Sequence, residues 1–179
     1  MPPVNNAIAT LNETYDRILG DLPEHVRERL KLVVDKMPLE KKDTAVTRLR
    51  IYGTPLRGFW SSSWCFYEIG CGRYRPRGAE GWNVGGTGLF SAIRQKGCGG
   101  GKYEAPLRGI LSKALASRPT EFTLLKPGDY DDEKEKTAFF LQRRYVGSQF
   151  PSFPIQQAAE DAVWLIQSTL PQIDAMLTR

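Results

Sequence analysis

The stretch that decides the fold runs from Trp64 to Gln95 and reads WCFYEIGCGRYRPRGAEGWNVGGTGLFSAIRQ. Its beginning, Trp64 to Ile69, is rich in aromatic residues and lies between serines and glycines, which is typical of a strand. Gly81 to Gly85 is a shorter candidate strand, and Leu89 to Lys96 is expected to form a short helix that is entered through glycines. The stretch therefore predicts two strands joined by an arginine-rich connection and followed by a helix.

The residues before this stretch follow helical patterns. Apolar residues recur at helical spacing over residues 4–19, which predicts an amphipathic helix. A second helix is expected over residues 21–37, with Pro23 in its first turn, and a shorter helical stretch over residues 39–52. We therefore expect residues 1–58 to form an N-terminal helical brace.

The residues after it are expected to form a helix, a strand and two further helices. Residues 105–117 have an apolar face at helical spacing, and residues 121–125 are a candidate third strand. An acidic start at Asp131 or Asp132 predicts a helix that runs through Gln142. A final helix is expected over residues 155–176, kinked or split at Pro171.

This order of elements is typical of an α+β fold, because strands and helices do not alternate regularly. We expect a small three-stranded sheet flanked by helices, with extra helices at both ends of the chain. Residues 59–154 would form the α+β core, and residues 155–179 would form a C-terminal helix packed on that core.

Composition and charge limit the classes of partner. The chain has 179 residues, 41% hydrophobic content and a net charge of +5, which fits one globular domain and permits a polyanionic partner. The middle of the chain is more basic than the whole. Between Arg73 and Arg118 the sequence contains the following charged residues: Arg73, Arg75, Arg77, Arg94, Lys96, Lys102, Arg108, Lys113 and Arg118, against Glu80 and Glu104.

Three cysteines without a CxxC pair argue against a zinc site and a disulfide framework, so we expect a reduced intracellular compartment, either the cytoplasm or the nucleoid or nucleus. No signal peptide or membrane-spanning run is apparent, and no membrane partner is expected. His25 is the only histidine and lies in a charged helical start, which argues against histidine-based catalysis.

A family resemblance rests on the residues quoted above. Cys65-Phe66-Tyr67, with its extension Tyr67-Glu68-Ile69, resembles the first motif of the GIY-YIG nuclease superfamily, and Asn83 to Thr87 resembles the second. The resemblance spans roughly residues 64–150, and it implies a GIY-YIG-like core. The family's helix arginine falls near Arg94.

The same resemblance suggests where a metal would bind. The metal-binding glutamate of the family corresponds to Glu133 or Glu135, and Glu135 is preferred because it directly precedes an apolar helical face. The chain also departs from the family pattern. Tyrosine would be expected at Asn83 and glycine near Cys65, and the late asparagine of the family has no clear counterpart near Phe150.

The resemblance implies a metal-dependent endonuclease that hydrolyses phosphodiester bonds in DNA with Mg²⁺ or Mn²⁺. Tyr67, Arg94 and Glu135 would be catalytic, and Glu135 would hold the metal. The alternative is a non-catalytic nucleic-acid-binding module on the same scaffold, which the replacement at Asn83 favours. The sequence leaves open whether RNA is a substrate. It also leaves open whether the protein forms a homodimer.

The chemistry of these residue types fits such a reaction. Arginine neutralises charge on a phosphate through two parallel N–H donors, and a carboxylate can hold one Mg²⁺. A tyrosine in a basic site could have a lowered pKa and activate water. Each residue also has an ordinary interpretation. Tyr67 could be a strand aromatic with its hydroxyl at the surface, Arg94 a solvated residue, and Glu135 part of an acidic first helical turn.

Basic and aromatic residues around the two motifs are candidates for contact with nucleic acid. The arginine-rich connection could grip phosphates, and its tyrosine could stack on a base, although the same residues also suit a solvated hairpin loop. The candidate nucleic-acid-binding residues are Arg73, Tyr74, Arg75, Arg77, Asn83, Lys96, Lys102 and Arg108.

Overall fold

A computed structural model describes residues 4–35, 47–54, 59–60, 65–72, 88–95, 103–125, 139–145 and 155–178. The elements in these residues are, in chain order, α1 (Val4–Asp21), α2 (Glu24–Arg27), β1 (Leu30–Asp35), β2 (Thr47–Gly53), β3 (Cys65–Gly72), β4 (Gly88–Gln95), α3 (Glu104–Ser117), β5 (Thr123–Leu125), β6 (Phe139–Tyr145) and α4 (Ile155–Leu177). The protein is therefore a mixed α+β structure.

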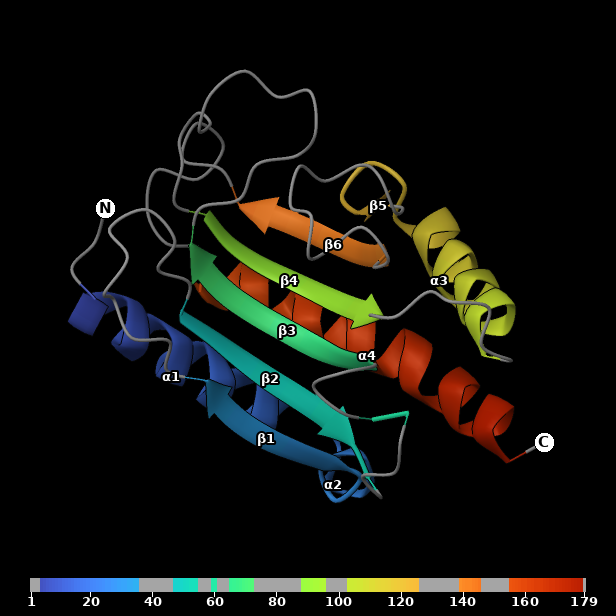
Figure 1. Cartoon of the computed structure of the whole chain (residues 1–179). Helices are drawn as coiled ribbons and strands as arrows, with labels where there is room; N and C mark the ends of the chain where they lie inside the picture. Colours follow the sequence, from blue (N-terminus) through green and yellow to red (C-terminus); the bar gives the residue numbers. More distant parts are fainter. Residues whose placement is uncertain are drawn as a thin grey trace.

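The strands form one sheet of six strands in the order β1-β2-β3-β4-β6-β5, and every neighbouring pair is antiparallel. Helices α1 and α4 pack against each other and lie on the same side of the sheet, behind the strands in Figure 1. Helix α3 contacts α4 and the edge strand β5. The described part of the chain thus has a helical layer over one face of the sheet.

The register assigns each strand position to one of two faces, because side chains alternate along a strand and directly paired residues share a face. The face toward α4 is identified by Tyr67, whose hydroxyl lies 2.8 Å from the hydroxyl of Thr169 on that helix. We call this face the helix face and the opposite one the arginine face.

The two faces differ in chemistry. The helix face has mostly apolar positions, which include Leu30, Leu32, Val34, Leu49, Ile51, Cys65, Tyr67, Ile69, Leu89, Ile93, Leu124, Leu141 and Tyr145, with Thr47, Ser91, Gln95 and Arg143 as polar or charged exceptions. The arginine face has mostly basic, aromatic and glycine positions, which include Lys31, Arg48, Arg50, Tyr52, Phe66, Gly70, Gly72, Gly88, Phe90, Arg94, Phe140 and Arg144, together with Val33, Gln142 and the acidic positions Asp35, paired with Arg48, and Glu68, paired with Arg50.

The core lies between the helix face and the helical layer. Helix α4 buries a stripe at helical spacing, made of Ala158, Ala162, Leu165, Ile166, Leu170 and Ile173. Helix α3 contributes Leu107 and Leu111, and α1 contributes Ile18, all of which are fully buried. Because burying one such aliphatic side chain contributes about 1.5–3 kcal/mol, these helices and the helix face stabilise each other.

Several predicted elements are confirmed. Helices at 4–19, 105–117 and 155–176 and strands at 64–69 and 121–125 correspond to α1, α3, α4, β3 and β5. Helix α4 continues through Pro171 as one helix, so the proline does not split it.

Other predictions were wrong, and all of them took strands for helices. The expected helix over 21–37 is the single turn α2 followed by β1, and the helical stretch expected over 39–52 ends in β2. The helix expected over Leu89 to Lys96 is strand β4, and the end of the helix expected through Gln142 is strand β6. Among the described residues the sheet therefore has six strands instead of the expected three, and residues 1–58 are not a purely helical segment.

The physical reason is that these strands are covered on both faces or have an ambiguous pattern. Strand β4 lies between β3 and β6, and consecutive residues of β3, from Cys65 to Ile69, are all buried. A strand in a sheet that is covered on both faces need not alternate apolar and polar residues. In β1 the apolar residues fit a helical repeat and a strand repeat equally well. The expected strand at 81–85 lies outside the described residues.

Candidate functional site

Tyr67 is a core residue of the helix face. Only 3% of it is exposed, and its ring stacks on Trp60 with 5.7 Å between the ring centroids. The Thr169 hydroxyl donates to the backbone carbonyl of Leu165 at 2.6 Å, so the Tyr67 hydroxyl donates to Thr169. Tyr67 thereby ties β3 to α4.

The environment of Tyr67 does not suit a catalytic base. Burial raises its pKa well above the ordinary value, and the hydrogen bond with Thr169 only partly opposes this shift. The expectation that a basic site lowers the pKa of Tyr67 was therefore wrong. The physical reason is that the hydroxyl lies in a dry core, where the phenolate is poorly solvated.

The position of Arg94 in β4 belongs to the other face of the sheet. It pairs directly with Phe66, whereas Tyr67 pairs with Ile93, so the positions of Arg94 and Tyr67 belong to opposite faces. The structure does not bring them together, and the expected convergence on one phosphate fails for this pair. Glu133 and Glu135 lie outside the described residues.

Most of the candidate nucleic-acid-binding residues also lie outside the described residues. These are Arg73, Tyr74, Arg75, Arg77, Asn83, Lys96 and Lys102. Arg108 is described and exposed on α3, where its guanidinium lies 2.9 Å from the carboxylate of Glu104. Contact of these residues with nucleic acid stays a prediction.

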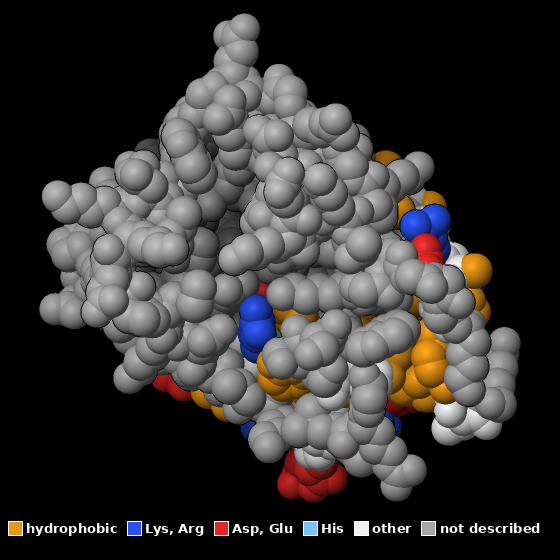
Figure 2. Space-filling view, viewed as in Figure 1, with side chains coloured by type: hydrophobic (Ala, Val, Ile, Leu, Met, Phe, Trp, Pro, Cys, Tyr) orange, Lys and Arg blue, Asp and Glu red, His pale blue; other side chains and the backbone are white. Residues whose placement is uncertain are grey.

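The centre of the arginine face is an ion pair packed on an aromatic ring. Arg50 Nε lies 3.6 Å from Glu68 Oε2, and the Arg50 guanidinium lies 4.4 Å from the centroid of the Phe66 ring. Glu68 is 1% exposed and Arg50 is 8% exposed. Figure 2, viewed toward this face, shows a basic side chain beside hydrophobic ones over the middle of the sheet. Because these groups are buried, the centre of the arginine face is not accessible to another molecule.

One end of the arginine face has a different character. Gly70, Gly72 and Gly88 occupy paired positions where β3 ends and β4 begins; we call these three residues the glycine floor. Glycine in a strand leaves the backbone bare and allows another molecule to approach closely.

Arginine positions border the glycine floor on both sides. Arg48 of β2 pairs with Gly70, and Gly70 pairs with Phe90 of β4, which in turn pairs with Arg144 of β6. Four neighbouring strands span three inter-strand spacings, which places the two arginine backbones about 14 Å apart. Strand β3 ends at Gly72, and Arg73 is the next residue in the sequence.

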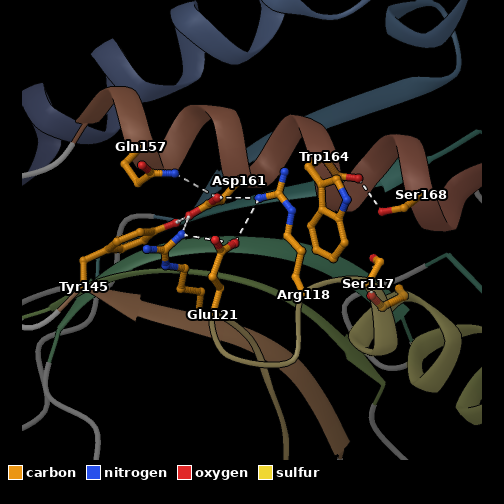
Figure 3. A network of polar contacts seen from close by, with 10 residues as sticks. Ser117, Arg118, Glu121, Tyr145, Gln157, Asp161, Trp164 and Ser168 are labelled. Carbon is orange, nitrogen blue, oxygen red and sulfur yellow. Dashed lines mark hydrogen bonds and ion pairs between the residues drawn. The ribbon is translucent and has the colours of Figure 1, made fainter.

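The buried carboxylate of Asp161 contacts β6 on its helix face. Figure 3 shows Asp161 of α4 pointing toward β6 and the segment after α3, at the centre of a polar network. Its side chain is 0% exposed. It accepts hydrogen bonds from Arg118 at 3.1 Å, Arg143 at 3.0 Å, the Tyr145 hydroxyl at 2.7 Å and Gln157 at 3.1 Å.

Two further interactions complete this network. The Glu121 carboxylate lies 3.4 Å from Arg118 and 3.6 Å from Arg143. The Arg118 guanidinium also lies 4.4 Å from the centroid of the Trp164 ring. Two arginines thus share two carboxylates, and the buried one accepts from enough donors to offset its loss of hydration.

The network fixes the position of β6. Arg143 and Tyr145 both reach Asp161 from the helix face, so Arg144 between them belongs to the arginine face. A slip of one residue would exchange the two faces of the strand. Sequence reasoning missed this role of Asp161, although an aspartate between Ala158 and Leu165 on the apolar stripe of α4 was a usable signal.

The described residues offer neither a metal cluster nor a membrane-spanning helix. None of their histidine, cysteine, aspartate and glutamate side chains forms a group of three or more that could hold a metal ion. Within the same residues, no helix has the length and apolar character needed to cross a membrane.

Comparisons with protein-family models, with curated proteins and with solved structures found no match for this chain.

Proposed function

We propose that the protein binds nucleic acid through the arginine face, and that the phosphate backbone approaches the glycine floor. The observation that carries this proposal is the register, which gathers the positions of Arg48, Arg94 and Arg144 on the sheet face opposite α1 and α4. The net charge of +5 and the basic middle of the chain support it.

The chemistry of this face favours contact with phosphates over contact with bases. Arginine binds phosphate through two parallel N–H donors and keeps its charge at every physiological pH. Tyr52 and Phe66 are 5% exposed or less, so they are packed core residues and do not offer a stacking platform. Binding should therefore depend strongly on salt and weakly on sequence.

Metal-dependent cleavage of DNA by a GIY-YIG-like core is the second candidate. The sequence resemblance over residues 64–150 and the position of Arg94 on the arginine face support it. Binding without cleavage is the stronger candidate, because Tyr67 and Arg94 belong to opposite faces and Tyr67 is held in the core.

The test is a titration of a fluorescently labelled duplex and a labelled single strand, followed by anisotropy. Arg48→Gln combined with Arg144→Gln should weaken binding about a hundredfold, since removing each charged hydrogen bond costs about 1.5 kcal/mol, or about tenfold in affinity. The matched control is Arg17→Gln combined with Lys113→Gln, which removes the same charge from exposed positions of α1 and α3.

The outcomes separate the alternatives. Equal losses of affinity in the two double variants would show that the total charge matters and the arginine face does not. Failure of the wild-type protein to bind either oligonucleotide would overturn the proposed function. Incubation of the same proteins with supercoiled plasmid in Mg²⁺, in Mn²⁺ and in chelator tests cleavage, and metal-dependent nicking would favour the second candidate.

A further inference from the structure

Strand β1 forms one edge of the sheet. Within the described residues it pairs only with β2, on one side. An edge strand presents backbone N–H and C=O groups that another strand can pair with. In Figure 1, β1 borders the sheet on the side away from β6 and β5.

One hydrogen bond shows which backbone groups point outward. The Thr54 N–H donates to the Arg29 carbonyl at 2.7 Å, so the carbonyl just before β1 points toward β2. These groups alternate along an antiparallel strand. The backbone groups of Leu30, Leu32 and Val34 therefore point away from β2, toward the open edge.

The sequence of β1 is complementary to itself in one antiparallel register. With Val33 opposite the partner's Val33, Leu32 lies opposite the partner's Val34, and both residues of that pair have outward backbone groups. The same register places Lys31 opposite the partner's Asp35. These oppositely charged residues would occupy a pair without backbone hydrogen bonds, where side chains come closest.

We propose that two copies of this chain associate through β1, in antiparallel pairing centred on Val33. A lysine on an edge strand usually discourages pairing with other chains. In the self-complementary register, Asp35 of one copy lies opposite the lysine of the other copy. This pair of opposite charges occurs twice per dimer, because the interface is two-fold symmetric. The pairing extends the sheet across the two-fold axis.

The dimer has a consequence for the surfaces described above. A two-fold axis perpendicular to the sheet keeps the helical layers of both copies on one side and both arginine faces on the other. The two arginine faces then form one continuous surface. The association does not rest on the proposed nucleic-acid binding, and it can be measured on the protein alone.

The primary test is sedimentation velocity of the wild-type protein over a range of concentrations, beside two variants. Lys31→Glu places two like charges opposite each other at both symmetric pairs and should raise the dissociation constant about tenfold or more. Lys31→Glu combined with Asp35→Lys restores opposite charges and should restore the dimer. Lys113→Glu on α3 makes the same charge change at an exposed position away from β1 and should leave the dimer unchanged.

A second measurement covers variants that fold poorly. Val33→Cys should form a disulfide-linked dimer under mild oxidation, because the two copies of this residue face each other across the axis. Ser112→Cys, exposed on α3, is the control for cross-linking at random. A wild-type protein that stays monomeric at every concentration, or a dimer unaffected by Lys31→Glu, would overturn the proposal. The proposal would also be overturned if the protein with Lys31→Glu and Asp35→Lys failed to dimerise and Val33→Cys failed to cross-link.

Discussion

Replacing Asp161 by asparagine should destabilise the protein more than any comparable change on α4. The side chain has the same size, but the charge that holds Arg118, Arg143 and the Tyr145 hydroxyl is removed. The asparagine amide would also present N–H groups toward donors that need an acceptor. Two positive charges would then remain next to a site that is fully buried.

The size of the effect follows from the exposure of the partners. Removing one member of a buried ion pair typically costs 3–5 kcal/mol. Arg118 keeps 32% of its side chain exposed and Arg143 keeps 17%, and both still have Glu121 nearby at 3.4 and 3.6 Å. We therefore expect the lower end, about 3 kcal/mol, for Asp161→Asn.

Urea unfolding followed by tryptophan fluorescence measures this change in stability, since Trp164 stacks near Arg118 and reports on the network. Glu160→Gln is the matched control, because it makes the same carboxylate-to-amide change at an exposed neighbour on α4 and should cost less than about 0.5 kcal/mol. A destabilisation below about 1 kcal/mol for Asp161→Asn would refute the reasoning, because Asp161 would then contribute no more than an exposed pair.

Two further changes test the packing of the sheet. Burial raises the pKa of Tyr67 and of the Cys65 thiol, so the folded protein keeps protons that the unfolded chain releases. The free energy of unfolding should therefore be highest below about pH 8 and fall above about pH 9. Urea unfolding measured against pH should show that Tyr67→Phe costs about 1 kcal/mol near pH 7 and makes the alkaline loss of stability shallower. Gly53→Ala should destabilise the fold by about 1–3 kcal/mol, because the added Cβ would lie 2.5 Å from the Trp60 ring. Gly109→Ala on α3 has open space around it and should be neutral or stabilising by up to about 1 kcal/mol. Equal thermal midpoints for these two variants would contradict the packing around Gly53.

The helices could be predicted from the sequence better than the strands. Helix α4 has an apolar stripe along its 23 residues, and only a helix satisfies so long a repeat. Strand β1 is short, and its apolar residues fit both periods: Leu30, Val33 and Val34 have helical spacing, whereas Leu30, Leu32 and Val34 alternate as in a strand, so local pattern could not decide between helix and strand. Long-range pairing with β2 settles it, and no window of sequence contains that information.

The candidate site was harder to predict because it depends on register. Tyr67 and Arg94 are plausible catalytic partners by residue type, but a shift of one position decides which face each belongs to. The arginine face needs the pairing of β2, β3, β4 and β6, whose strands come from separate parts of the chain. Asp161 could have been singled out, since a charged residue on an apolar helical stripe needs buried partners.

Nucleic-acid binding through the arginine face is tested most directly by the salt dependence of duplex affinity. The logarithm of the association constant should fall linearly with the logarithm of salt concentration for the wild-type protein. Arg48→Gln combined with Arg144→Gln should reduce the steepness of that line by about 1.8, or about 0.9 for each phosphate that is no longer neutralised, while Arg17→Gln combined with Lys113→Gln leaves it unchanged. An Arg48→Gln and Arg144→Gln protein with the wild-type slope would contradict the account, because the phosphates would then be bound elsewhere on the protein.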